Sequence, residues 1–219
     1  MHVLVNAAMS ADGKLSTRHR EQIAISGSTD FDRVEQLRAD SDAVMVGVGT
    51  VLADDPSLTV EDADRVAARR DRGEPDQPAR VVADSRGRTP PDARVLDGAA
   101  ETYVLLSEAA TAEDHQRLAD ETTTIVAGDD RVDLAAALAA LEAHGIDRLM
   151  VEGGGEVIFS LFEAGLVDEL SVFVGPIIIG GREAPTLADG EGFRSEFPEL
   201  DLNAVKRLDE GILLRWAVT

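Results

Sequence analysis

Residues 151–170, VEGGGEVIFSLFEAGLVDEL, have the clearest potential for chemistry in this chain. The apolar run that reaches Val151 is typical of a buried strand, and the apolar spacing that follows predicts a helix ending near Gly165. A strand that passes through glycines into a helix presents backbone N–H groups at the positive end of the helix dipole, which favours a phosphate-bearing ligand. Gly153, Gly154 and Gly155 would let that ligand approach the backbone closely, although a plain glycine turn gives the same pattern.

Two charged residues at strand ends extend this hypothesis. Glu152 stands between the buried strand and the glycines, where a surface acid gains little, so we expect it to contact a ligand. Lys14 is one of only two lysines and follows the turn residues Asp12 and Gly13 at the end of the first predicted strand. In a chain this negative, a phosphate ligand needs local cations, and Lys14 is a candidate for that contact.

Three arginines are further candidates for binding an anion. Arg38 lies on a predicted helix among apolar neighbours, and Arg86 and Arg88 flank a glycine directly after a predicted strand. Arginine donates to phosphate oxygens in a fixed, bidentate geometry. Each of these arginines could equally pair with a nearby acid, so the sequence leaves both interpretations open.

The charge of the chain limits its partners. Its 219 residues include 42 acidic and 21 basic ones, for a formal net charge of −21. This charge argues against nucleic acid and anionic membranes as partners. The scarcity of lysine and the excess of Asp over Glu are typical of proteins from a halophilic archaeon or another salt-loving organism, with an acidic mesophilic protein as the alternative.

Several classes of site are excluded or disfavoured by composition and spacing. The chain has no Cys, which excludes disulfides, a cysteine nucleophile and a thiolate zinc site. Its four histidines are scattered and predict no metal site. Gly47 and Gly49 begin a glycine pattern, but Leu52 stands where a Rossmann fingerprint needs its third glycine. No phosphate-loop motif is present.

The apolar periodicity predicts alternating strands and helices, which are typical of an α/β sheet that is parallel in its middle. We expect a single domain over residues 1–219, with a charged surface segment at about residues 61–79 and an antiparallel hairpin at the C-terminal edge. The first strand does not resemble a signal peptide, so a cytoplasmic protein is expected. Strands are predicted at 2–8, 43–48, 80–83, 103–106, 123–126, around 149, 169–174 and within 204–218; helices at 31–39, 50–53, 112–119 and 134–143 and after Gly155. Thr29 or Ser28 can cap the helix at 31–39, and Asp133 can cap the helix at 134–143.

Four sequence blocks, taken together, resemble one family, the riboflavin-pathway pyrimidine reductases. Residues 6–14 are similar to its S-x-D-G-K segment, and residues 37–39 with 46–60 (VGVGTVLADDPSLTV) are similar to its second signature. VADSRGRTP, residues 82–90, resembles a third block. VEGGGEV, GLVDEL and GPIIIGGREAPT resemble a fourth, so the resemblance covers nearly the whole chain in order.

The resemblance implies a fold, a reaction and an assembly. The fold would be a dihydrofolate-reductase-like mixed sheet with helices on both faces, and the assembly a homodimer. The reaction would reduce C1′ of a ribosylamino group to ribityl in a phosphorylated pyrimidine, with NADPH, or NADH as an alternative donor. No metal is implied.

The resemblance also implies roles for residues at matching positions. Lys14 and Glu152 would act in catalysis and contact the substrate, together with Arg38 and Leu58. The cofactor-binding residues would be Thr50, Asp54, Ser85, Arg86, Gly153, Gly154, Gly155 and Glu156. Two positions depart from the family pattern: residues 22–26 lack a Trp that bacterial members often have, and Glu61 replaces a basic residue found in some relatives.

Two other functions fit the same residues. Another reductase on the same fold, such as a dihydrofolate reductase, would share the cofactor segments, although the D-G-K and VEGGG segments favour the pyrimidine reductases. A non-catalytic nucleotide-binding protein would bind NADPH without oxidising it when the substrate is added. A substrate assay separates the three.

The net charge predicts that stability depends on salt. Self-repulsion among 42 acids is strong in dilute buffer and is largely screened at molar salt, where the Debye length is roughly 3 Å. We expect a lower melting temperature in dilute buffer than in molar potassium chloride. Equal melting temperatures in the two solutions would contradict adaptation to salt.

Overall fold

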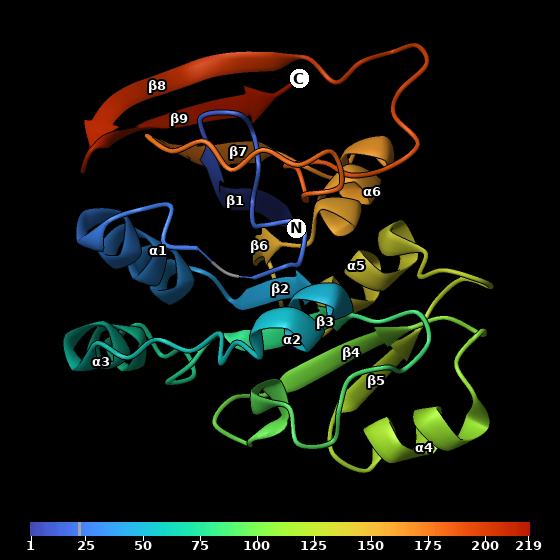
Figure 1. Cartoon of the computed structure of the whole chain (residues 1–219). Helices are drawn as coiled ribbons and strands as arrows, with labels where there is room; N and C mark the ends of the chain where they lie inside the picture. Colours follow the sequence, from blue (N-terminus) through green and yellow to red (C-terminus); the bar gives the residue numbers. More distant parts are fainter. Residues whose placement is uncertain (22) are drawn as a thin grey trace. The chain divides into compact units, whose positions relative to one another are not determined.

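The computed structural model describes residues 1–21 and 23–219 and forms two compact units. The first unit consists of Met1 and Glu35–Met150, and the second of His2–Val34 and Val151–Thr219. Figure 1 labels their helices and strands. Among the described residues, no helix is both long and apolar enough to cross a membrane.

A parallel sheet forms the centre of the first unit. Its strands β2 (Ala43–Gly47), β3 (Ala79–Ala83), β4 (Thr102–Leu106) and β5 (Thr123–Val126) neighbour one another in the order β5-β4-β3-β2. The residues of β2, β3 and β4 are mostly apolar and buried, as expected for strands covered on both faces, whereas the edge strand β5 is mostly half-buried or exposed. β6 (Arg148–Gly153) is the other neighbour of β2, opposite β3. Its residues up to Met150 belong to the first unit, and the rest belong to the second.

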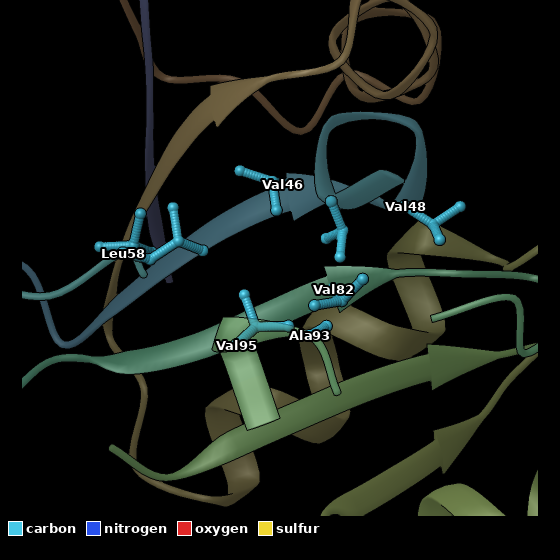
Figure 2. Close-up of a cluster of buried hydrophobic side chains, with 8 residues drawn as sticks. Val46, Val48, Leu58, Val82, Ala93 and Val95 are labelled. Atoms are coloured by element: carbon cyan, nitrogen blue, oxygen red, sulfur yellow. The ribbon is translucent and has the colours of Figure 1, made fainter. Parts of the chain in front are cut away.

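A cluster of aliphatic side chains holds the short helix α2 (Val48–Asp54) on β2 and β3 (Figure 2). Full burial of one such side chain stabilises the fold by about 1.5–3 kcal/mol. The cluster therefore fixes the segment that carries Thr50 and Asp54. Its buried members are Val44, Val46, Val48, Val51, Leu58, Val82, Ala93 and Val95.

The charged segment at residues 61–79 contains a helix, α3 (Ala63–Asp71), which the sequence analysis did not predict. The side chain of Asp62 caps this helix by accepting from Asp64 N and Arg65 N. Arg69 is 1% exposed, and its guanidinium donates to the carbonyls of Ala39, Ser41 and Pro75 at 2.7–2.9 Å. A buried cation with three backbone acceptors anchors a segment whose composition indicates only a solvated surface.

The remaining helices of the first unit agree closely with prediction. The bounds of α4 (Ala112–Ala119), β5 and α5 (Leu134–Ala143) are those expected, and the side chain of Asp133 caps α5 as expected, accepting from Ala136 N. A short 3-10 helix spans Arg94–Leu96.

The second unit combines a parallel pair with an antiparallel hairpin. β1 (His2–Ser10) pairs in parallel with β7 (Glu169–Gly175), and β9 (Gly211–Val218) pairs antiparallel with both β7 and β8 (Leu200–Leu208). A β-bulge interrupts the β8–β9 ladder between Leu202 and Ala204. Helix α6 (Gly155–Glu163) follows β6. The antiparallel C-terminal hairpin is therefore confirmed.

The start of α1 (Ser28–Asp40) differs from the prediction that Ser28 or Thr29 caps it. Instead, the carboxylate of Asp209, in the β8–β9 turn, accepts from Thr29 N at 3.3 Å and from Asp30 N at 3.0 Å. A Cβ at Gly27 would lie 2.7 Å from the carboxyl carbon of Asp209, so the absence of a side chain permits this approach. A residue 180 positions away therefore caps the helix.

We expect loss of this cap to lower stability. Asp209 has φ 47°, so Asp209→Gly removes the carboxylate without adding backbone strain, and it should lower the melting temperature by about 2–4 °C. Asp209→Asn should retain most of the stability, because an amide oxygen can also cap a helix. Asp201→Asn, an exposed acid on β8, is the control.

The same cap predicts a pH dependence. The hydrogen bonds from Thr29 and from the backbone lower the pKa of Asp209 below its usual value. Its contribution is therefore complete above the unfolded-state pKa near 3.8 and disappears as pH falls through the lowered folded-state pKa. The difference in melting temperature between the wild type and Asp209→Gly should be largest near neutral pH and should close in strong acid. A difference that grows on acidification would refute the assignment.

Candidate ligand-binding and active-site residues

The glycine segment has the predicted strand–glycine–helix geometry. β6 ends at Gly153, and Gly154 is the N-cap residue of α6 with φ 91°, a conformation that side-chain-bearing residues rarely adopt. Because Gly154 has no side chain, the cap position supplies no acceptor to the first N–H groups of α6. The segment therefore has the backbone form of an anion-binding helix start.

The space beside Gly155 is occupied by the chain itself. A Cβ at Gly155 would lie 2.5 Å from the carbonyl oxygen of Thr186 and 2.7 Å from a carboxylate oxygen of Asp189. The backbone N–H of Asp189 donates to the Gly155 carbonyl at 2.9 Å. Gly155 thus permits close packing against residues 186–189, and close approach of a ligand stays a prediction for Gly153 and Gly154.

Lys14 lies in a loop that is fixed by its own hydrogen bonds. Asp12 accepts from Ser10 Oγ at 2.6 Å and from the backbone N–H groups of Ile179 and Gly180 at 3.0 and 2.7 Å. These bonds, that from Ser10 above all, lower the pKa of Asp12 to about 2. Ser10 Oγ also accepts from Lys14 N at 2.9 Å, so the Asp12 carboxylate organises the turn before the lysine.

The half-buried Lys14 meets the chain near the partners of Gly155. Its ammonium donates to the carbonyl of Ala184 at 3.1 Å, and its backbone forms an antiparallel bridge with Thr186. An ammonium has three donors, so a ligand oxygen could accept from another. Lys14 and the glycine segment therefore meet the same stretch, residues 184–189.

The two acids beside the glycines differ in environment. Glu152 is half-buried on β6, and Glu156 is exposed in the first turn of α6. A carboxylate in the first turn stabilises the helix dipole, which gives Glu156 a structural role independent of any ligand. Glu152 has the burial expected of a residue that lines a site.

The predicted cofactor residues of the first unit follow two paired strands. Gly47 of β2 lies opposite Ala83 of β3, so α2 and the turn after β3 begin at the same edge of the sheet. Thr50 is half-buried within α2, and Asp54 is its exposed last residue. Neighbouring protein atoms remove part of the water around the Asp54 carboxylate, and this raises its pKa although the side chain is still exposed to solvent.

A buried carboxylate shapes the turn that contains Ser85. Asp84 is fully buried and accepts from Thr89 N at 2.7 Å and Thr89 Oγ1 at 2.8 Å. The carbonyl of Ser85 accepts from Ser107 Oγ at 2.8 Å, and its hydroxyl oxygen accepts from Val132 N at 3.1 Å. A serine that accepts in this way can still donate its own proton to a ligand.

Arginines surround this turn. Arg86 and Arg88 are exposed on it, and Arg117 of α4 donates to the carbonyls of Gly87 and Thr89 at 2.6 and 2.9 Å. Asp84 and Arg117 therefore hold the turn from two directions. Cations concentrated at a strand end in so acidic a chain form a favourable site for a phosphate.

In the first unit, Arg38 bonds to the residue that follows Leu58. Arg38 donates to the carbonyl of Thr59 at 3.1 Å. Leu58 is 1% exposed and its side chain packs in the core cluster (Figure 2). Its φ of 55° is strained for a residue with a side chain, and such strain gathers at functional sites. The buried side chain leaves only the backbone of Leu58 for the substrate contact, which stays a prediction.

The predicted residues thus fall into two groups, one in each unit. Lys14 and residues 152–156 belong to the second unit, and the others to the first. Gln22, at the start of the segment that departs from the family pattern, lies outside the described residues. Sequence reasoning missed the residues that fix these loops. Ser107 and Arg117 bond to residues 22 and 28 positions away, which no local pattern indicates. The others bond within their own turns, where the residue types alone did not single them out: Ser10, Asp84, Thr186 and Asp189.

A hollow of about 340 Å³ in the first unit lies away from these residues. It is lined in part by Thr102 and Thr123, at the amino ends of β4 and β5, whereas Ser85 follows the carboxyl end of β3. Ligands of open α/β sheets bind at carboxyl ends, so the hollow is not the candidate site. No cluster of side chains suited to a metal ion occurs among the described residues.

Two relatives resemble the chain over nearly its full length, and both are named 2,5-diamino-6-ribosylamino-4(3H)-pyrimidinone 5′-phosphate reductase. The protein from Archaeoglobus fulgidus is 46% identical over 210 residues, which cover 96% of this chain and 94% of the relative. The protein from Methanothermobacter thermautotrophicus is 44% identical over 219 residues, which cover 99% and 98%.

Solved structures share the fold. A pyrimidine reductase-like protein from Corynebacterium diphtheriae superposes with a TM-score of 0.81 at 22% identity, over all of this chain and 92% of that one. Acinetobacter baumannii RibD gives 0.77 at 26% identity, over all of this chain and 58% of that one. The mixed, dihydrofolate-reductase-like α/β fold implied by the sequence resemblance is confirmed.

The family model described as the RibD C-terminal domain matches residues 1–214. Together with two relatives at 44–46% identity, this match covers the glycine segment, the Lys14 loop and the Ser85 turn in the expected order. The chain belongs to the RibD C-terminal domain family.

Proposed function

We propose that this chain reduces 2,5-diamino-6-ribosylamino-4(3H)-pyrimidinone 5′-phosphate to its ribitylamino product in riboflavin biosynthesis. The observation that carries the proposal is 46% and 44% identity to two reductases named for this substrate, over nearly the whole of each chain. The family likeness also supports a homodimer as the working assembly.

The proposed cofactor is NADPH. A reduced nicotinamide supplies a hydride, and the ring-opened ribosylamine is an imine whose C1′ accepts it. Two features of this structure suit a dinucleotide phosphate: the uncapped start of α6 after Gly154, and the arginines of the Ser85 turn. Thr50, Asp54 and Glu156 complete the proposed set of cofactor contacts.

The main task of the chain's own residues is positioning. In the second unit, Lys14 would hold the 5′-phosphate or ribose oxygens. For the first unit, the family likeness supports Arg38 and the backbone at Leu58 as substrate contacts. Glu152 would accept a hydrogen bond from the substrate and assist proton transfer when the ribose ring opens. Correct placement of two reactants accounts for a large share of the rate enhancement in such reactions.

The direct test follows NADPH oxidation by the purified protein in molar salt. NADPH oxidation should follow addition of the ribosylamino-pyrimidine phosphate and should not follow addition of dihydrofolate. Turnover with dihydrofolate alone would indicate a different reductase. NADPH binding without turnover of either compound would indicate a nucleotide-binding protein.

The Ser85 turn should determine the choice between NADPH and NADH. A charge-assisted hydrogen bond to the 2′-phosphate contributes about 1.5–3 kcal/mol. Arg86→Ala with Arg88→Ala should therefore weaken NADPH binding by about tenfold or more while changing NADH binding little. Arg70→Ala, at an exposed arginine of α3, is the control. Equal losses for both dinucleotides, measured by titration, would refute this role.

Lys14→Met should reduce kcat/KM for the phosphorylated substrate by about ten- to a hundredfold, because it removes a charged donor worth about 1.5–3 kcal/mol. NADPH affinity should change little. Met retains most of the stem, so the melting temperature should fall only slightly, through loss of the contact to Ala184. Lys206→Met changes the chain's other lysine, which is exposed on β8, and should leave turnover unchanged. Near-normal kcat/KM in Lys14→Met would assign substrate anchoring to another residue.

A further inference from the structure

We propose that Asp189, acting through Thr186, is a positioning residue that holds the Lys14 loop and the glycine segment in one fixed arrangement. The functional consequence rests on the function proposed above, whereas the coupling between the two segments rests on contacts within the second unit alone.

Asp189 closes a short turn with its side chain. Its carboxylate oxygens accept from Thr186 N at 3.1 and 3.2 Å, and one of them also accepts from Thr186 Oγ1. Two donors of Thr186, an N–H shared between both carboxylate oxygens and the hydroxyl, fix the shape of residues 186–189, because bonds to a charged acceptor are stronger than neutral ones.

One side of this turn contacts the glycine segment. The Asp189 N–H donates to the carbonyl of Gly155 at 2.9 Å. The Thr186 carbonyl and the Asp189 carboxylate occupy the space that a Cβ at Gly155 would fill. Since Gly155 is the first residue of α6, the turn sets the position of the helix start that is proposed to bind the cofactor.

The other side of the same turn contacts the Lys14 loop. Thr186 bridges Lys14 through the backbone, and Leu15 N donates to the carbonyl of Pro185 at 2.9 Å. The Lys14 ammonium donates to Ala184 one residue earlier. Thr186 is therefore common to both contacts, and its conformation depends on the Asp189 carboxylate.

This arrangement couples two sites with different ligands. Opening the 186–189 turn would release the helix start and the lysine together, so substrate and dinucleotide binding should weaken in parallel. Lys14→Met, in contrast, removes a substrate contact alone. Asp189 itself accepts only from its own turn in the contacts described here, which makes it a positioning residue rather than a catalytic one.

The experiment measures NADPH affinity, substrate KM and hydrogen exchange of the amides at positions 15 and 189 in four variants. Each exchange rate is taken relative to the unfolded-chain rate of the same variant. Asp189→Ala removes the carboxylate, and Thr186→Val removes one donor with little change in shape. Thr186→Ser keeps that donor and should restore wild-type behaviour. Glu191→Gln changes an exposed acid on the same segment and is the matched control.

In Asp189→Ala we expect exchange of both amides, the NADPH dissociation constant and the substrate KM each to rise about tenfold or more, since bonds to a charged acceptor are lost. In Thr186→Val the same quantities should rise together by a smaller factor, which preserves the test if Asp189→Ala does not fold. The proposal is overturned if the two amides respond independently, or if the melting temperature falls while both affinities stay within twofold of wild type.

The two proposals fail in distinguishable ways. Parallel exchange of Leu15 and Asp189 in a protein that does not reduce the pyrimidine would refute the proposed function and support the coupling. Normal turnover with independent exchange at the two amides would do the opposite.

Discussion

The parallel pairing of β2 with β3 is the constraint on which the first unit depends. Because Gly47 lies opposite Ala83, both strands end at the same edge of the sheet. The helix α2 and the Asp84–Thr89 turn therefore begin next to each other. Apart from the buried Arg80, which bonds to Val95 and Asp97, the residues of these two strands are apolar. Functional side chains can therefore appear only where the strands end, and the buried Asp84 carboxylate holds one of those ends in shape.

In the second unit, loops position the candidate functional side chains. Its catalytic candidates, Lys14 and Glu152, belong to segments far apart in sequence, one a loop that Ser10 and Asp12 hold and the other the end of β6. Residues 184–189 join these segments from a third one, by hydrogen bonding to Lys14 and Leu15 and to Gly155. Polar contacts between backbone groups fix these loops, where the first unit uses an aliphatic core.

The sequence predicted those features whose signals lie within an element. The apolar periodicity located α4 and α5, Asp133 identified a helix start, and the glycines after Val151 marked the strand-to-helix turn. It could not predict contacts between distant residues. Nothing local indicates that Arg69 would be buried against three carbonyls and anchor α3.

For the candidate site, too, the sequence predicted local features but not contacts between separate segments. Residue types placed Lys14 and the Ser85 turn at loop positions, as the structure has them. Leu58 was expected to contact the substrate, yet its side chain is in the core, because burial of an aliphatic group outweighs the cost of its left-handed backbone. Thr186 and Asp189 escaped notice because their importance lies in which loops they join.

The bulge in β8 has a consequence for solubility. An outer strand with apolar residues such as Leu200, Leu202 and Val205 at its surface is a template onto which other chains can add, and repeated addition produces fibrils. The extra residue between Leu202 and Ala204 breaks the regular spacing of hydrogen-bonding groups halfway along that strand. A foreign strand can match one half of the template but not both, so the bulge disfavours edge-to-edge strand addition even in salt concentrations that screen the acidic surface.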